Sequence, residues 1–211
     1  MGKLQVEKFM KKYLMGFFKS VFNKNVQEVI PAVALLDKNT LRVLPPIPDS
    51  LVREHAKLGF ELQNKSESKF DKIRRIYDFL NLYNNFARTF TVCGKGCSAC
   101  CKVDVSITKL EAIYIEKNTG RVARRTKKHT RKHKSSCPFL VDNNCSVYDY
   151  RPFNCRTLYT LDDPKYCETK ESHQLYGASG GAGIKMIYVL KEFSEYMNGN
   201  NGTADIRDYF H

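Results

Sequence analysis

The sequence predicts a mainly α fold, in which a helical N-terminal unit and a C-terminal helix flank an irregular, cysteine-rich region. Apolar residues recur at helical spacing in the first part of the chain, all eight cysteines fall within residues 93–167, and turn residues interrupt the chain over residues 137–167. With 211 residues, the chain is long enough to bury a core without covalent cross-links. We expect three parts: a helical unit over residues 1–91, a cysteine-cluster domain over residues 92–176, and a helix with a flexible tail over residues 177–211.

Three helices are expected in the first part. Residues 3–22 carry an apolar stripe at spacings i, i+3, i+4 and i+7, with lysines between its members, which predicts an amphipathic helix. Docking on the core is favoured over binding to an anionic membrane surface, although the pattern suits both. Pro45-Pro46-Ile47-Pro48 predicts an extended connector, after which Asp49 or Ser50 caps a helix over residues 51–63. A longer helix follows, marked by Phe70, Ile73, Ile76, Tyr77, Leu80 and Tyr83.

Shorter elements are expected after residue 101. Thr108-Lys109-Leu110-Glu111 matches a capping box, and Gly120 marks the end of the helix that it starts. A last helix is predicted by the apolar spacing from Ile184 to Phe193. The polar residues 198–211 are expected to be loose, unless Tyr209 and Phe210 dock on the core.

The cysteines are clustered in a way that points to shared chemistry. Four of them lie in the run Cys93-Gly94-Lys95-Gly96-Cys97-Ser98-Ala99-Cys100-Cys101, and the others follow as Cys137, Cys145, Cys155 and Cys167. Cys97 and Cys100 have the C-x2-C spacing that presents two sulfurs to one tetrahedral ion. A thioredoxin-like redox pair would need a βαβ pattern, which the sequence lacks. Neighbouring Cys100 and Cys101 point in different directions, so they suit two centres or two corners of one cluster.

The compartment decides between metal ligation and disulfides. No stretch has the pattern of a secretory leader, and no run approaches the roughly 20 apolar residues of a membrane span. We therefore expect a cytoplasmic protein, in which thiols stay reduced and bind metal more often than they form disulfides. Eight cysteines with no required histidine fit two sites of four sulfurs or one larger iron–sulfur assembly. Ligand type does not separate zinc from iron, because thiolate suits both.

From the first cysteine to the last, the sequence resembles the CxxCxxCC, or YkgJ-type, cysteine-cluster family, whose members are described as zinc- or iron-chelating domains. The resemblance covers about residues 93–170 and rests on five features in order: the run from Cys93 to Cys101, Glu111 near a helix start, Cys137-Pro138-Phe139-Leu140, the segment from Cys145 to Arg156, and Cys167. It implies that all eight cysteines bind zinc or an iron–sulfur cluster. The first gap has three residues instead of two, which makes Cys93 the least secure ligand.

Charge near the thiolates has to be balanced. Four thiolates around Zn²⁺ or a [4Fe–4S]²⁺ cluster leave a charge of about −2, so nearby cations are needed. Arg151 and Arg156 lie beside Cys155 and are expected to bind the cofactor in this way, rather than to form surface ion pairs. Tyr148 suits either a core position or a hydrogen bond to sulfur. His129 and His133 lie among Arg and Lys and are expected to be solvated, and His173 is a reserve ligand.

Three functions stay open. The first is metal binding with a structural or electron-transfer role. The second is an enzyme, because some members of the family that the chain resembles join this domain to protein modification, including lysine methylation of flagellin; no methyl-donor motif is visible here. The third is binding of nucleic acid, or of an acidic protein, through residues 121–134. That run holds eight Arg and Lys and no acid, out of a net charge of +13, but lacks aromatic residues for base stacking.

Overall fold

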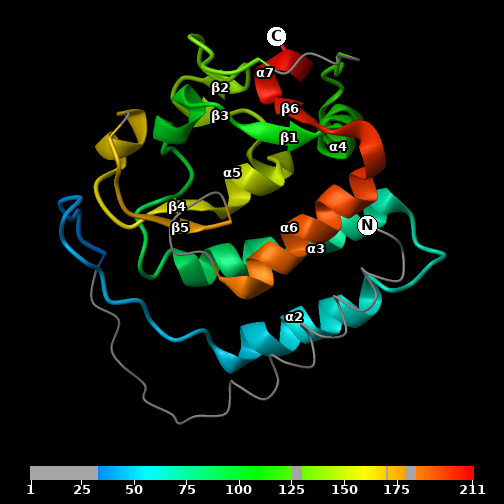
Figure 1. Cartoon of the computed structure of the whole chain (residues 1–211), viewed down its shortest axis with the longest axis horizontal. Helices are drawn as coiled ribbons and strands as arrows, with labels where there is room; N and C mark the ends of the chain where they lie inside the picture. The colour runs from blue at the N-terminus through cyan, green and yellow to red at the C-terminus, as the bar shows by residue number, and fades with distance from the viewer. Residues whose placement is uncertain (1–32, 125–129, 170, 179–183) are drawn as a thin grey trace.

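The computed structural model of the chain describes residues 33–124, 130–169, 171–178 and 184–211 (Figure 1). These residues are mainly helical, as predicted, and their strands are short. The helix predicted over residues 3–22 lies outside the described residues. Three long helices, α2 (Asp49–Glu61), α3 (Lys69–Ala87) and α6 (Lys185–Asn198), lie together, with α2 and α6 both packed against α3. The shorter elements lie to one side of this helical layer (Figure 1).

The two predicted helices before the cysteine run are confirmed. The connector before α2 is irregular, as Pro45-Pro46-Ile47-Pro48 predicts. The expected cap by Asp49 or Ser50 is wrong, because Pro48 holds the N-cap position without a side-chain cap and both residues lie inside the first turn. There the Asp49 carboxylate suits the positive end of the helix dipole. Helix α3 starts at Ser68, whose hydroxyl accepts a hydrogen bond from the Asp71 N–H at 3.2 Å.

Helix α4 (Lys109–Thr119) has the predicted ends. Thr108 Oγ1 accepts from the Glu111 N–H at 3.1 Å, and Glu111 Oε2 accepts from the Thr108 N–H at 2.7 Å, so the capping box is complete. Gly120 follows with φ of 71°, the left-handed conformation that ends a helix at low cost. The box fixes α4 directly behind the strand β1 (Ser106–Thr108).

Between the cysteine run and α6 the chain forms many short elements, as its turn residues predict. The described strands make three two-stranded antiparallel sheets, β1–β6, β2–β3 and β4–β5. Asp142 and Asn143 join β2 (Leu140–Val141) to β3 (Asn144–Cys145) with φ of 48° and 58°, as a two-residue hairpin turn requires. The remaining elements are η1 (Ala99–Lys102), η2 (Tyr148–Tyr150), α5 (Phe153–Thr157), β4 (Leu158–Thr160), η3 (Pro164–Glu168), β5 (Leu175–Gly177) and η4 (Gly199–Asn201).

Residues 204–210 are buried, so the expectation of a loose tail over residues 198–211 is wrong, and its alternative, in which Tyr209 and Phe210 dock on the core, is confirmed. Strand β6 (Thr203–Asp205) pairs with β1, and Ser106 lies opposite Asp205 in the register. Helix α7 (Ile206–Tyr209) follows, and Tyr209 and Phe210 are only 3% and 2% exposed. The apolar side chains of this segment gain a core position by pairing with a strand nearly 100 residues earlier, which no local pattern reveals.

Two apolar cores lie on opposite sides of the cysteine loop. The first joins α2, α3 and α6 to Tyr159 and Tyr176, and Cys93 packs against it. The second joins β1, β6 and α7 to buried Phe139, and Cys137 and Cys145 pack against it. The division of the chain into three parts, after residues 91 and 176, stays a prediction. Residues from all three parts contribute to the first core. In the described residues, no helix is both long enough and apolar enough to cross a membrane.

Candidate metal centre

All eight cysteines line one cavity of about 90 Å³ that is partly open to solvent. None of them is in a disulfide. The cysteines in its lining come from the cysteine loop, the segment before β2, β3, α5 and η3, so thiols spread over 75 positions of the sequence meet here, together with residues of α3, η2, β4 and α7. The structure therefore brings together every thiol that the sequence nominates.

The first four thiols are arranged by consecutive tight turns. The Cys97 N–H donates to Gly94 O at 3.2 Å, and the Cys101 N–H donates to Ser98 O at 2.9 Å. Gly96 has φ of 94°, a conformation that side chains with a Cβ rarely adopt. Because the chain turns twice in nine residues, four thiols face one cavity.

Cys93 and Cys167 are positioned by the hairpin β4–β5 and by η3. The Thr160 N–H, at the end of β4, donates to Cys93 Sγ at 3.2 Å. Cys167 lies on η3, which packs against η1. An ion pair of 2.7 Å between Lys102 Nζ and Glu168 Oε1 joins these two elements at the surface.

The other distal thiols approach from the second core. The Cys137 N–H donates to Cys101 O at 2.8 Å, which places the start of the distal segment directly on the cysteine loop. Cys145 lies in β3, opposite Leu140 in β2. Cys155 lies in α5. The hairpin and α5 thus bring Cys145 and Cys155 to the same cavity as the cysteine loop.

The thiols impede one another's ionisation. Burial is the main cause that raises the pKa of Cys93 and of Cys167 to about 12, and that of Cys155 well above its usual range. The charge of Cys100 adds to all three increases. Hydrogen bonding with the Cys101 thiol lowers the pKa of Cys100 to about 7 and also lowers the pKa of Cys137. A cation among these sulfurs would remove the conflict, because thiolates ionise readily when they bind a metal.

The donor set fits a thiophilic metal, but the sulfurs are spread around the cavity. In the described part of the chain, no three Cys, His, Asp or Glu side chains form a group that holds one ion as they stand. A single zinc ion needs sulfurs at about 2.3 Å, and therefore about 3.8 Å from each other. The eight thiols instead surround one shared space. This arrangement suits a cofactor with several metal atoms, whereas single metal ions would bind only after the cysteine side chains rotate.

Arg151 lies where the predicted role needs it. Its guanidinium lines the cavity and stacks over the Tyr148 ring at 3.8 Å from the centroid. Its charge helps to lower the pKa of Cys100, after the hydrogen bond from Cys101. Tyr148 itself is half-buried, and its hydroxyl accepts from Arg88. Tyr148 therefore serves as a platform for arginine in this structure.

Arg156 also lines the cavity, but its side chain donates hydrogen bonds to protein oxygens. Its side chain is fully buried and donates to Arg151 O and Asn81 Oδ1 at 2.7 Å each, and to Asp149 O. These bonds tie η2 and the start of α5 to α3. Arg156 thus fixes the backbone on either side of Arg151.

Replacing Arg156 by lysine is expected to lower the free energy of unfolding by about 1–3 kcal/mol, because a lysine cannot reproduce three hydrogen bonds from a planar fork. Urea unfolding followed by circular dichroism measures this change. Arg53→Lys, at an exposed site of α2, is the matched control. Equal stability of the two variants would show that the three bonds are not needed.

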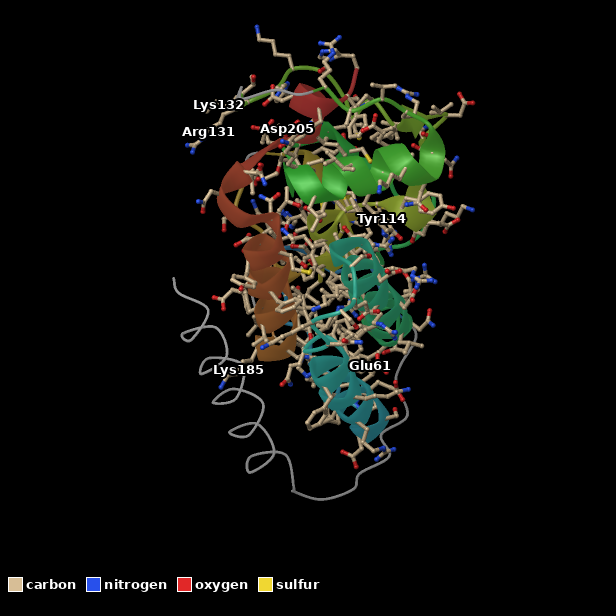
Figure 2. All side chains as sticks on the ribbon, turned by 90° about the vertical axis from the view of Figure 1, so that its right-hand side faces the viewer. Glu61, Tyr114, Arg131, Lys132, Lys185 and Asp205 are labelled. Atoms are coloured by element: carbon tan, nitrogen blue, oxygen red, sulfur yellow. The ribbon has the colours of Figure 1, made fainter. Side chains whose placement is uncertain are left out.

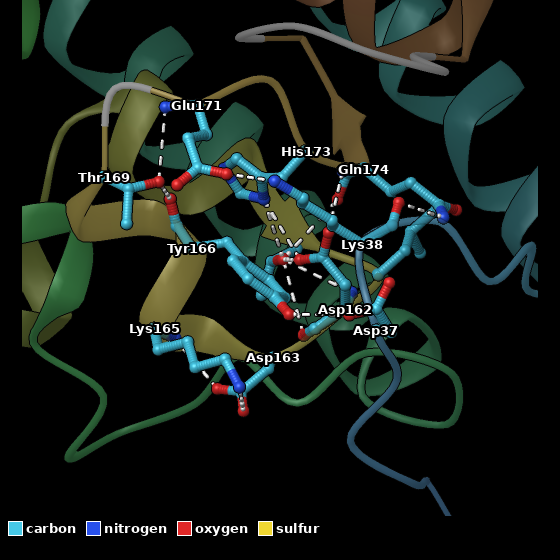
Figure 3. Close-up of polar contacts among 12 residues, drawn as sticks. Asp37, Lys38, Asp162, Asp163, Lys165, Tyr166, Thr169, Glu171, His173 and Gln174 are labelled. Atoms are coloured by element: carbon cyan, nitrogen blue, oxygen red, sulfur yellow. Dashed lines mark hydrogen bonds and ion pairs between the residues drawn. The ribbon is translucent and has the colours of Figure 1, made fainter.

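A polar network that the sequence did not reveal supports Cys93 and Cys167 (Figure 3). Asp162 is fully buried and accepts from Gln174 N at 2.8 Å, from His173 Nδ1 at 3.0 Å, and from Thr160 Oγ1. His173, which the sequence nominated as a reserve ligand, thus lies against Asp162. Hydrogen bonds from the side chain of Thr160 lower the pKa of Cys167, although burial outweighs them. The network joins β4 to β5 just behind these two thiols.

Asp162 is expected to stabilise the fold at neutral pH but not in acid. Burial alone would raise its pKa, but hydrogen bonds from Thr160, Gln174 and His173 outweigh burial and hold the pKa below its usual value. A carboxyl with a lowered pKa in the folded state contributes stability above its unfolded pKa of about 3.9, and this contribution is lost as pH falls through the folded value. Asp162→Asn should therefore lower the urea midpoint at pH 7 and have a smaller effect at pH 3.

The control for that prediction is Asp78→Asn, at an exposed position of α3. Its effect on the urea midpoint should be small at both pH values. A deficit of Asp162→Asn that is as large at pH 3 as at pH 7 would contradict the account, since it would come from packing rather than from the ionised carboxylate.

Arg207 in α7 is the other supporting residue that the sequence did not reveal. Its Nη2 donates to Cys101 O at 3.0 Å and to Val103 O at 3.1 Å, and its Nε donates to Ser135 O at 2.8 Å. Asp205 pairs with it at 3.0 Å. The C-terminal segment thereby holds the backbone of the cysteine loop. From the sequence alone that segment is expected to be loose, so no role is assigned to Arg207.

The described ends of the basic run, residues 121–124 and 130–134, lie against the C-terminal segment. The Arg124 N–H donates to Tyr209 O at 2.8 Å, and the His133 N–H donates to Asp104 Oδ1 at 2.9 Å. The expectation of a solvated His133 is wrong, because Nε2 lies 3.7 Å from an oxygen of buried Asp205. Figure 2 shows Arg131 and Lys132 at the same end of the molecule as Asp205. His129 lies outside the described residues.

Comparison with known proteins identifies the class of this site. Residues 92–175 match the model of the CxxCxxCC family, whose description reads "Putative zinc- or iron-chelating domain". The segment that matches this family model contains all eight cysteines. The comparison with curated proteins gave no match, and neither did the comparison with solved structures.

Proposed function

We propose that this chain is a metal-binding protein in which all eight cysteines hold zinc or an iron–sulfur cluster. One observation carries the proposal: thiols from the cysteine loop, the segment before β2, β3, α5 and η3 line a single cavity. The chelating description of the matched family supports it. An iron–sulfur group would supply electron transfer, whereas zinc would hold the fold together.

The protein's own residues prepare this cavity for an anionic metal–thiolate group. Arg151 brings a positive charge to the cavity wall, and the Thr160 N–H donates to Cys93 Sγ. Donors and cations beside ligand sulfurs offset the charge that deprotonated thiols leave. Arg207 and Asp162 hold the backbone behind the thiols, so the loop keeps its shape when metal is loaded.

We place the protein in the cytoplasm, where thiols that are free in the structure stay reduced. Protein modification and nucleic-acid binding gain no support from the contacts of the described residues, so neither is proposed. The described ends of the basic run are engaged with Asp104 and with the C-terminal segment.

The test is the metal and acid-labile sulfide content of protein purified without oxygen, together with its absorption spectrum. Metal that is lost in parallel with thiol substitution supports the proposal. Iron with sulfide identifies an iron–sulfur cluster, and zinc without sulfide identifies a structural site. Protein that is folded and free of both metals would refute it.

A further inference from the structure

We propose that the cavity also binds a small carboxylate beside the metal centre, through Asn84, Arg88 and Arg151. All three side chains line the same cavity as the eight thiols. The inference rests on the proposed function, because the metal–thiolate group would form the inner wall of this site. It adds a ligand whose chemistry the thiols themselves do not specify.

Asn84 is the strongest indication of a missing partner. It is 6% exposed, and its Nδ2 has no hydrogen-bond partner among the residues that the structure describes. The Tyr159 hydroxyl donates to Asn84 Oδ1 at 2.6 Å, which fixes the amide so that its Nδ2 group remains available. A buried donor without a partner is destabilising, and a ligand oxygen in the cavity would supply the missing acceptor.

Two arginines meet at Tyr148 on the same cavity. Arg88 lies one helical turn after Asn84, on the same face of α3, and its Nη2 donates to the Tyr148 hydroxyl at 3.1 Å. The guanidinium of Arg151 lies on the ring of this tyrosine, and its buried Nε also lacks a hydrogen-bond partner in the described part of the chain. Arg88 is exposed and still lines the cavity, so it lies at the opening. Positive charge therefore extends from the opening to the interior.

The number and kind of these hydrogen-bond donors indicate which class of ligand the cavity would bind. The interior offers one neutral amide N–H group and one guanidinium N–H group without partners, which matches the two oxygens of a carboxylate. A phosphate would bring more charge and more oxygens than these two donors satisfy. The other walls include Val147, Leu158 and Tyr159, which suit a short apolar tail. We therefore infer a small carboxylic acid in its ionised form.

Calorimetric titration of the metal-loaded protein at pH 7 tests this site, with acetate, acetamide and inorganic phosphate as probes at constant ionic strength. Acetate should bind, and acetamide and phosphate should each bind more weakly. Asn84→Asp keeps the acceptor for Tyr159 but repels an anion, and Arg88→Gln removes the charge at the opening. Each should weaken acetate binding about tenfold or more, since a hydrogen bond to a charged group is lost or reversed.

Matched controls change the same charges elsewhere. Asn85→Asp alters the exposed neighbour of Asn84, and Arg53→Gln removes an exposed charge from α2. Both should leave acetate binding unchanged, and all four variants should keep the wild-type metal content. Loss of metal in Asn84→Asp and Arg88→Gln would overturn the inference, because the donors would then serve the metal centre. Absence of acetate binding, or tighter binding of phosphate, would also overturn it, whereas protein without metal would refute the proposed function instead.

Discussion

Replacing Cys100 by serine is expected to lower the affinity for metal by at least about tenfold. Substitution of residues that only hydrogen-bond to metal ligands already has an effect of this size. A serine hydroxyl is a harder and less acidic donor than a thiol. Cys100 also influences most of the other thiols, because its charge or hydrogen bonding raises the pKa of Cys97, Cys101 and Cys155, besides that of Cys93, Cys145 and Cys167. Thermal stability should fall with it, because metal binding contributes to folding.

Metal content after gel filtration and the melting temperature measure this effect. Ser98→Ala lies in the same turn, carries no thiol, and should behave as the wild type. Cys93→Ser should lose less metal than Cys100→Ser, because Cys93 lies at the edge of the group and precedes an irregular gap. If Cys100→Ser kept its full metal content, the central position of Cys100 would be refuted.

Replacing Glu111 by glutamine should lower the free energy of unfolding by about 3–5 kcal/mol, because hydrogen bonds to a charged group contribute about 1.5–3 kcal/mol each and at least two are lost. Glu111 is 4% exposed and joins three elements. Besides its capping bonds to Thr108, its Oε1 accepts from the Tyr77 hydroxyl at 3.0 Å and from the Phe153 N–H at 2.7 Å. The last bond fixes the start of α5, which carries Cys155.

Glu54→Gln, at an exposed position of α2, is the control and should change stability by less than about 0.5 kcal/mol, as surface substitutions usually do. Urea unfolding of both variants measures the difference. Nearly equal stability of the two variants would contradict this account. It would mean that Glu111 only caps α4 and does not join α4 to the cysteine region.

Local signals predicted a good part of this fold. The apolar spacing in α3 and α6 identified both helices, since a helix face is visible in any window of the sequence. The capping box and Gly120 identified both ends of α4, because each acts over three or four residues. The clustered thiols likewise identified the cavity, since the turns that gather Cys93 to Cys101 are local.

The supports of the site could not be predicted, because they act over long separations. Arg207 reaches the cysteine loop only after β6 has paired with β1, and Asp162 meets His173 and Gln174 only in the folded hairpin. The acidic residue at the start of α4 matched a family pattern, but its bonds to Tyr77 and Phe153 depend on the packing of α3 and α5. Patterns within a few residues carry no information on such contacts.

X-ray absorption at the edge of the metal found in the purified protein is the most direct test of the central claim. We predict a shell made only of sulfur, at about 2.3 Å, because eight thiols line the cavity and the nearby His173 is held by Asp162. The same spectrum of Cys100→Ser should show less metal per protein. A shell of nitrogen or oxygen would contradict the account, and so would folded protein that contains no metal.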